Sequence, residues 1–277
     1  MPRTLRIRSE NADFQHIETL RRNRAKRARS GEFLVEGVRN ITAALAGGWS
    51  VRALVHAEDR APSRWASAAL ADPRVETHYA LPGELLDRLT ERHEGAELLA
   101  LVRIPPDDPA RIPLVPGLRA VVFDRPASPG NLGSLIRSAD ALGAQGLIVL
   151  GHAADLYDPE TVRASTGSLF ALPCLRLAGP QELAAWLDAV RAGLGTLQVV
   201  GADEGGSVEA FRHDFTPPTV LLLGNETHGL SRALLDLCGA TVRIPMTGSA
   251  SSLNVAAAGT ALLYEMDRQR RSGLDGA

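Results

Sequence analysis

Short, wholly apolar runs alternate with helical stretches over residues 119–265, and this alternation limits the fold more than any other feature. Residues 120–123, 146–150 and 220–223 place apolar side chains or glycine at consecutive positions. Such runs are typical of strands that are buried on both faces. Because helical stretches separate them, the pattern predicts a parallel sheet with helices on both faces.

A proline-rich stretch divides the chain. Residues 104–117 contain five prolines, which restrict φ and remove backbone donors, so this stretch cannot form a helix or a central strand. We therefore expect an amino-terminal domain over 1–104, a linker over 105–118 and a second domain over 119–277. Strand-like runs at 51–55, 76–80 and 98–104 alternate with helical stretches in the first domain. They predict a small domain of α/β/α layers.

Composition points to the cytoplasm. No stretch approaches the roughly 18 consecutive apolar residues of a membrane span, and the first residues carry charge without the apolar segment of a secretory signal. Cys174 and Cys238 are far apart and form no Cys-x-x-Cys pattern. Each is expected to be a small core residue in a reducing environment.

Positive charge is concentrated near the amino terminus. Residues 1–40 hold ten basic and five acidic residues, although the whole chain has a net charge of −2. This basic arm suggests contact with a polyanion, and a solvated helix face is the alternative. The candidate contact residues are Arg21, Arg22, Arg24, Lys26, Arg27 and Arg29.

The first candidate motif, DRPASPGNLGSLIRSADALG, follows the strand at 120–123. A helix is expected to begin near Asn131, because asparagine is a good N-cap. Arg137 then lies about six residues into that helix. Taken singly, Asn131 is explained by capping and Arg137 by surface charge.

Two further motifs lie in loops that follow apolar strands, where open α/β sheets place their ligand sites. In GNETHGLS, Gly224 permits close approach to the backbone, Glu226 is an acid at a strand end and Ser231 is a candidate cap. His228 has no partner at metal-ligand spacing, so we expect no metal. In IPMTGSASSLN, a helix beginning near Ser252 would offer free N–H groups to an anion. A plain serine cap is the alternative.

Taken together, NLGSLIRSADALG, GNETHGLS and IPMTGSASSLNVAAAGTALLYE resemble the motifs of the SpoU (TrmH) family of RNA ribose 2′-O-methyltransferases. The block KRARSGEFLVEGVRNITAALAGGW is similar to the RNA-binding domain attached in that family, which has a ribosomal-protein-like α/β/α fold. The run 124–159 with RASTGSLF is similar to the avilamycin-type subgroup, which acts on 23S rRNA. Ser128-Pro129-Gly130 replaces the usual Asp-Pro pair of the broad family. The subgroup shares this change, which leaves in doubt only a role for that family aspartate.

The resemblance implies S-adenosylmethionine as cofactor, a trefoil knot formed by the carboxy-terminal segment and a homodimer with its active sites near the subunit interface. It implies cofactor contacts by the residues Leu223, Gly224, Asn225, Ile244, Pro245, Met246, Ser252 and Leu253. It implies catalytic roles for the residues Asn131, Arg137, Glu226, Ser252 and Asn254.

The implied reaction is an in-line attack of a ribose 2′-oxygen on the methyl carbon of the sulfonium. We expect Arg137 to clamp the target phosphate, because a guanidinium is a poor base at neutral pH. Glu226 would orient the reacting groups or accept the proton.

Four functions remain compatible with the sequence. They are methylation of 23S rRNA, with or without antibiotic resistance, methylation of tRNA, a non-catalytic rRNA-binding relative, and a small-molecule α/β enzyme. The missing phosphate loop disfavours the last.

Overall fold

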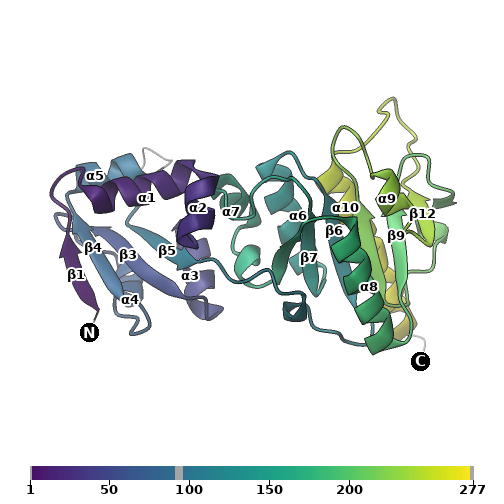
Figure 1. The fold of residues 1–277 in the computed structure, drawn as a ribbon, viewed down its shortest axis with the longest axis horizontal. Coiled ribbons are helices and arrows are strands. Elements are labelled where there is room, and N and C mark those ends of the chain that lie inside the picture. Colours follow the sequence, from purple (N-terminus) through teal and green to yellow (C-terminus); the bar gives the residue numbers. More distant parts are fainter. Residues whose placement is uncertain (1, 91–95, 275–277) are drawn as a thin grey trace. The chain divides into compact units, whose positions relative to one another are not determined.

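The chain forms two compact units in the computed structural model, which describes residues 2–90 and 96–274. The first unit contains the residues up to Pro105 together with Tyr157–Ala171, and the second contains Pro106–Leu156 together with the residues from Leu172 onward. Each unit is built around its own β-sheet (Figure 1).

Five strands make the sheet of the first unit, in the order β1-β4-β3-β5-β2. Strands β1, β4 and β3 are parallel, whereas β5 runs antiparallel to both β3 and β2. The elements before residue 105 are β1 (Arg3–Arg6), α1 (Ala12–Arg22), α2 (Arg24–Ser30), β2 (Glu32–Glu36), α3 (Val38–Ala46), β3 (Val51–Ala57), α4 (Arg64–Leu70), β4 (Thr77–Leu81), α5 (Gly83–Leu89) and β5 (Leu98–Arg103).

Helices cover both faces of this sheet, which confirms the predicted α/β/α layers. Figure 1 shows α1 and α5 together on one face and α3 and α4 on the other. Successive side chains of a strand point to opposite faces, so Ala53 and Val55 of β3 join Phe14 and Leu20 of α1 in one apolar core. Two layers of helix are needed because the strands are apolar on both sides.

The basic arm lies in two helices, α1 and α2, which are separated by Asn23. Its extended backbone ends α1, and its side chain accepts a hydrogen bond from Lys26 N to begin α2. Asparagine serves both ends because its short amide competes for backbone groups. Residues 32–36 follow α2 and form the edge strand β2.

A segment from beyond the proline-rich stretch completes the first unit. It contains α7 (Pro159–Ser165) and the short 3-10 helix η2 (Ser168–Phe170). The Tyr157 ring lies 4.8 Å from the Phe33 ring, and the Phe170 ring lies 5.1 Å from the Trp49 ring. Trp49 Nε1 also donates to Phe170 O at 3.0 Å. This aromatic cluster holds the segment to the strands and helices of residues 1–105.

Seven parallel strands make the sheet of the second unit, in the order β10-β12-β9-β11-β6-β7-β8. Its elements are η1 (Pro109–Arg111), β6 (Arg119–Asp124), α6 (Pro129–Ala141), β7 (Gly146–Leu150), β8 (Cys174–Leu177), α8 (Pro180–Leu194), β9 (Gln198–Ala202), β10 (Val208–Glu209), η3 (Ala210–Arg212), β11 (Thr219–Leu223), α9 (Arg232–Leu235), β12 (Ala240–Arg243) and α10 (Val255–Leu274).

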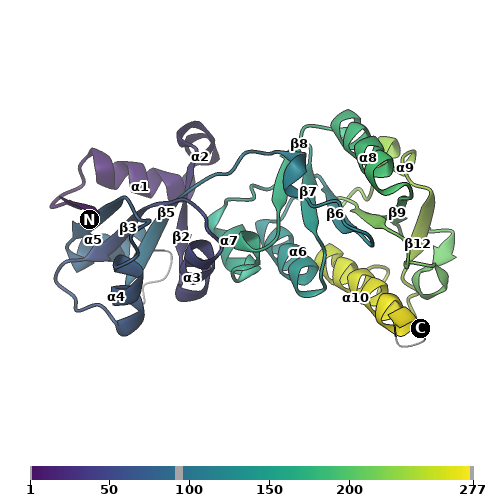
Figure 2. The same cartoon turned by 90° about the horizontal axis from the view of Figure 1, so that it is seen from below.

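The prediction of a parallel sheet with helices on both faces is confirmed. Figure 2 shows α8 on one face of this sheet and α6 beside α10 on the other. Val122 and Leu222 pack with Leu187 of α8 in a buried core. The alternate residues of the same strands are equally buried. Because every strand is parallel, all carboxyl ends lie at one edge, and the polar loops gather there.

Candidate active site

A cleft of about 1060 Å³ opens at the carboxyl ends of β9, β11 and β12. All of the residues predicted to bind the cofactor line it, namely Leu223, Gly224, Asn225, Ile244, Pro245, Met246, Ser252 and Leu253. Its volume is at the upper end of the range for small-molecule pockets, about 300–1,000 Å³. The second and third motifs therefore form the walls of a single cavity.

The 224–229 loop is closed on itself. Asn225 and Gly229 exchange two backbone hydrogen bonds of 3.0 Å, and Asn225 Oδ1 accepts from the backbone N–H groups of Thr227 and His228. A Cβ at Gly224 would overlap the backbone of Gly229 and Leu230. Glycine is required at 224 because the two ends of this loop touch.

Glu226 projects from this loop onto the start of α6. Its carboxylate accepts from Ala127 N at 2.9 Å, from Ser128 N at 3.1 Å and from Asn131 Nδ2 at 3.1 Å. Burial alone would raise the pKa of Glu226, but these three donors outweigh burial and hold its pKa below the ordinary value. Glu226 is thus a fixed anion at neutral pH.

Asn131 links Glu226 to Asn254. A carboxylate only accepts, so the Asn131 amide nitrogen must face Glu226, and its oxygen then accepts from Asn254 Nδ2 at 2.9 Å. The expectation that Asn131 is an N-cap is wrong. Ser128 caps α6 by accepting from Asn131 N, which leaves the Asn131 side chain available for this chain of hydrogen bonds.

The last helix begins three residues later than expected. α10 starts at Val255, and Asn254 Oδ1 accepts from the N–H groups of Ala256 and Ala257. The serine cap expected at Ser252 is wrong, because Asn254 satisfies two of the first N–H groups of this helix. Ser252 lies in the cleft wall, is exposed, and its side chain has no hydrogen bond within residues 2–90 and 96–274.

The 245–253 loop, unlike the 224–229 loop, is not held in place by hydrogen bonds. Within the described part of the chain, none of its backbone groups makes a hydrogen bond to another backbone group or to a side chain. Met246 and Leu253 remain 38% and 44% exposed. Its peptide groups and apolar side chains are thus available to a ligand.

Arg137 does not join the other candidate catalytic residues. It lies on α6 about 9 Å along the axis from Asn131, at 1.5 Å per residue, and is not among the residues that line the cleft. Its side chain is exposed and has no ion pair or hydrogen bond among residues 2–90 and 96–274.

Four charged residues near the cleft were not among the candidate residues predicted from the sequence. Asp124 is buried, accepts from Ser231 N at 3.1 Å and pairs with the Arg125 guanidinium. Arg125 has a left-handed backbone (φ 47°), and its carbonyl accepts from Asn225 Nδ2 at 2.7 Å. Asp203 and Glu204 line the cleft where β9 ends. An acidic pair directly after a parallel strand was the available signal.

Two of the six candidate RNA contacts, Arg21 and Arg27, are not exposed. Arg21 is half-buried, and its Nη1 donates to Thr90 O at 2.6 Å. Arg22, Arg24, Lys26 and Arg29 are exposed, whereas Arg27 is 3% exposed. Arg27 donates to Leu20 O at 2.9 Å and to Asp158 at 3.2 Å. Because its guanidinium is held by the fold, Arg27 joins helix α2 to its own unit and is not offered to an external polyanion.

Two features are absent from the described residues. No helix there combines the length and hydrophobicity needed to cross a bilayer. No three His, Cys, Asp or Glu side chains there lie close enough together to hold a metal ion.

Known proteins share both halves of this arrangement. Residues 119–264 match the SpoU rRNA Methylase family, and residues 11–100 match the SpoU L30e-like domain. A 23S rRNA (uridine(2479)-2′-O)-methyltransferase from Streptomyces viridochromogenes is 54% identical over 273 residues, which cover 98% of this chain and 95% of the relative.

Crystal structures give the same result. The SpoU methyltransferase AviRb from Streptomyces viridochromogenes, in complex with AdoMet, has a TM-score of 0.88 at 53% identity and covers 95% of this chain and 100% of its own. An AdoMet-bound rRNA methyltransferase from Sinorhizobium meliloti has a TM-score of 0.85 at 32% identity, covering 96% and 98%. The family predicted from the three motifs is confirmed, and the chain belongs to the SpoU rRNA methylase family.

Proposed function

We propose that the protein transfers a methyl group from S-adenosylmethionine to a ribose 2′-hydroxyl of 23S rRNA. One observation carries this proposal. Glu226, Asn131 and Asn254 form a continuous chain of hydrogen bonds at a cleft whose walls are the two loops expected to hold the cofactor. The 54% identical relative is named for this reaction on a uridine, so we expect a uridine ribose as the target.

The cleft fits S-adenosylmethionine. The open peptide groups of residues 245–253 suit the hydrogen-bonding edge of an adenine, and the acids Asp203 and Glu204 suit ribose hydroxyls. Gly224 lines the same cleft, where it lets the 224–229 loop close on itself. When bound, the cofactor supplies an electrophilic methyl group.

The lowered pKa of Glu226 supports an orienting role rather than proton acceptance. A general base works best when its pKa is near the operating pH. The three donors instead lower the pKa of Glu226, away from neutral pH. Glu226 instead fixes the Asn131 amide, and Asn131 fixes Asn254. The pair of amides then holds the 2′-hydroxyl in line with the methyl group.

Arg137 is assigned to the phosphate beside the target ribose, because its exposed guanidinium is without a partner in the described residues. A guanidinium binds phosphate through two parallel hydrogen bonds that lysine cannot reproduce. We expect Arg137→Lys to lower kcat/KM about tenfold or more, measured by methyl transfer to 23S rRNA. Full activity of this variant would contradict the clamp.

The exposed members of the basic arm, Arg22, Arg24, Lys26 and Arg29, would add salt-dependent affinity for RNA. Deleting the arm would also remove the buried Phe14 and Leu20, so substitution is the better test. Changing all four to Gln should raise the KM for RNA and flatten its salt dependence. An unchanged salt slope would contradict the assignment.

Several predictions from the sequence are carried forward as part of the proposal. They are the domain limits 1–104, 105–118 and 119–277, a trefoil knot, a homodimer and a cytoplasmic location. The exposed apolar ring of Tyr264, which does not line the cleft, supports the dimer. Light scattering in solution would test it.

The decisive experiment is transfer of tritiated methyl groups to total RNA, followed by primer-extension mapping of the modified ribose. Incorporation into 23S rRNA is the expected outcome. Incorporation into tRNA would favour the alternative substrate, and calorimetric binding of S-adenosylmethionine without transfer would favour a non-catalytic relative. Growth of a strain expressing the protein in the presence of avilamycin would test the resistance role.

A further inference from the structure

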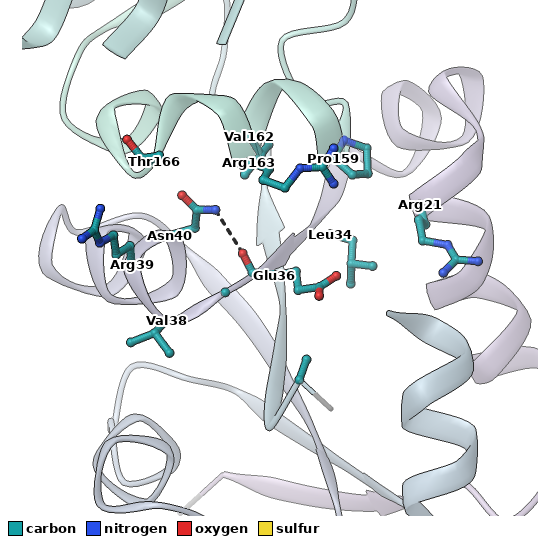
Figure 3. Close-up of a pocket in the computed structure, with 12 residues that line it drawn as sticks. Arg21, Leu34, Glu36, Val38, Arg39, Asn40, Pro159, Val162, Arg163 and Thr166 are labelled. Atoms are coloured by element: carbon teal, nitrogen blue, oxygen red, sulfur yellow. Dashed lines mark hydrogen bonds between the residues drawn. The ribbon is translucent and has the colours of Figure 1, made fainter. Parts of the chain in front are cut away.

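A second cleft lies within the first unit and uses none of the residues described above as catalytic. Its volume is about 370 Å³, within the usual range of about 300–1,000 Å³ for ligand pockets. Two stretches far apart in sequence form it: residues 34–40, where β2 gives way to α3, and residues 159–166 of α7 and its end. Figure 3 shows these two stretches facing each other, with Arg21 at one side.

Most of the charged side chains in the lining are basic. Arg21, Arg39 and Arg163 contribute guanidiniums, and Glu36 contributes the one carboxylate among the lining residues. Arg39 is exposed, and its side chain makes no ion pair or hydrogen bond among the described residues. The balance of charge favours an anionic ligand.

Asn40 provides an independent sign of a ligand. It is 6% exposed, and its Nδ2 donates to Glu36 O at 3.0 Å. Its Oδ1 is buried and has no hydrogen-bond partner among residues 2–90 and 96–274. Figure 3 shows this oxygen turned toward α7. A buried acceptor without a donor is destabilising, so a ligand that carries a hydroxyl or N–H group would satisfy it.

The beginning of α3 adds to the anion-binding character. Gly37 precedes the helix and supplies no side-chain cap to its first N–H groups. The amino-terminal end of a helix attracts anions through these donors and the helix dipole. Around it, the walls are apolar, formed by Leu34, Val38, Pro159 and Val162. An anion, a hydrogen-bond donor and a flat apolar group are together the parts of a nucleotide.

We propose that this cleft holds one unstacked nucleotide of the RNA substrate. Its phosphate would face Arg39 and the first turn of α3, and its base would lie against Val38 and Val162 within reach of Asn40 Oδ1. RNA is commonly recognised through bases that leave the stack and meet apolar and guanidinium surfaces. This inference rests on the proposed function, because it names a second contact with the same substrate.

Two variants of the full-length protein test the cleft. Arg39→Ala removes the guanidinium, and Val38→Trp occupies the cleft without changing the charge. Val38 is 54% exposed, so the larger side chain should not disturb the core, which a thermal melt would check. Each variant should raise the KM for 23S rRNA about tenfold, the size expected for one lost contact. The kcat and the calorimetric Kd for S-adenosylmethionine should stay within about twofold of the unmodified protein.

Arg64→Ala is the matched control, because Arg64 is an exposed arginine of the same unit that does not line the cleft. It should leave the KM unchanged. An unchanged KM in both cleft variants would overturn the proposal. So would an effect of Arg39→Ala without one of Val38→Trp, which would indicate surface charge alone. If the unmodified protein transferred no methyl group to RNA, the proposed function would be wrong. Filter binding of 23S rRNA by the same variants would still test whether the cleft binds RNA.

Discussion

The 224–229 and 245–253 loops line the same cleft, yet one is locked and the other is open. Two backbone hydrogen bonds, the Asn225 amide and three donors to Glu226 fix the first loop. The second loop has no hydrogen bond from its backbone within the described residues. Each loop contains four polar side chains, so the presence of polar residues alone does not show which loop is fixed.

This difference suggests that the two loops have different roles in catalysis and in cofactor binding. Transition-state stabilisation depends on groups that are already in place before the reaction, which suits the locked loop and its link to Asn131. An open loop can adapt its peptide groups to a ligand, at the cost of becoming ordered on binding. We therefore expect the locked loop to determine kcat and the open loop to determine cofactor affinity.

The largest effect is expected from Asn131→Ala, which removes the link between Glu226 and Asn254. Loss of one preorganised polar group typically lowers kcat by about 10²–10³-fold, and single-turnover methyl transfer would measure it. The Kd for S-adenosylmethionine should change less than about threefold. Ser134→Ala, at an exposed position of the same helix that does not line the cleft, is the control and should be nearly fully active. A large loss of cofactor affinity in Asn131→Ala would contradict the expectation that the locked loop determines kcat and the open loop determines cofactor affinity.

Glycine substitutions compare the rigidity of the two loops directly. At Gly224 a new methyl group would overlap the Gly229 backbone, whereas at Gly248 no atom lies within 4 Å. Gly224→Ala should lower the free energy of unfolding by about 1–3 kcal/mol, and Gly248→Ala should change it by less than about 0.5 kcal/mol. Urea denaturation followed by intrinsic fluorescence would measure both. Equal effects would mean that the two loops are equally constrained.

Leu253→Ala tests the open loop. Leu253 is 44% exposed without ligand, and a cofactor that covers it would bury apolar surface worth about 1 kcal/mol. The calorimetric Kd for S-adenosylmethionine should therefore rise about fivefold, with kcat at saturating cofactor unchanged. A lower kcat with an unchanged Kd would reverse the roles assigned to the two loops.

The smallest expected effect is the pH dependence of the locked loop. The folded pKa of Glu226 lies below its ordinary value of 4.5, so its contribution to stability is complete above that value and is lost as the pH falls through the folded pKa. The stability difference between the unmodified protein and Glu226→Gln should stay constant from pH 7 to about pH 5 and shrink below about pH 4.5. Urea midpoints across this range would show it. A difference that grew on acidification would contradict the lowered pKa.

Local sequence patterns determined much of this protein. Continuous apolar runs predicted parallel strands covered on both faces, and glycine, serine, asparagine and glutamate after those strands predicted the loops of the cleft. These features follow from neighbouring residues, because strand burial and turn formation are decided over a few positions. The family followed from the same loops, since the three motifs are continuous in sequence.

Only the tertiary structure decided which polar groups meet. Asn131 reads as a cap in sequence, and its amide became a link only because Glu226, 95 residues later, presents a carboxylate to it. Arg27 is one charge among many in the basic arm, and it is buried only because Asp158 and the carbonyl of Leu20 surround it. Non-local partners of this kind leave no periodic trace in a single sequence.

The tertiary structure also decided which residues form the first unit. The prolines of residues 104–117 leave only the three-residue 3-10 helix η1 in that stretch. They gave no sign that Tyr157 and Phe170 would return to pack on Phe33 and Trp49. That return brings α7 opposite the start of α3 and creates the second cleft. Apolar side chains determine that they will be buried, but the partners they are buried against depend on the path of the whole chain.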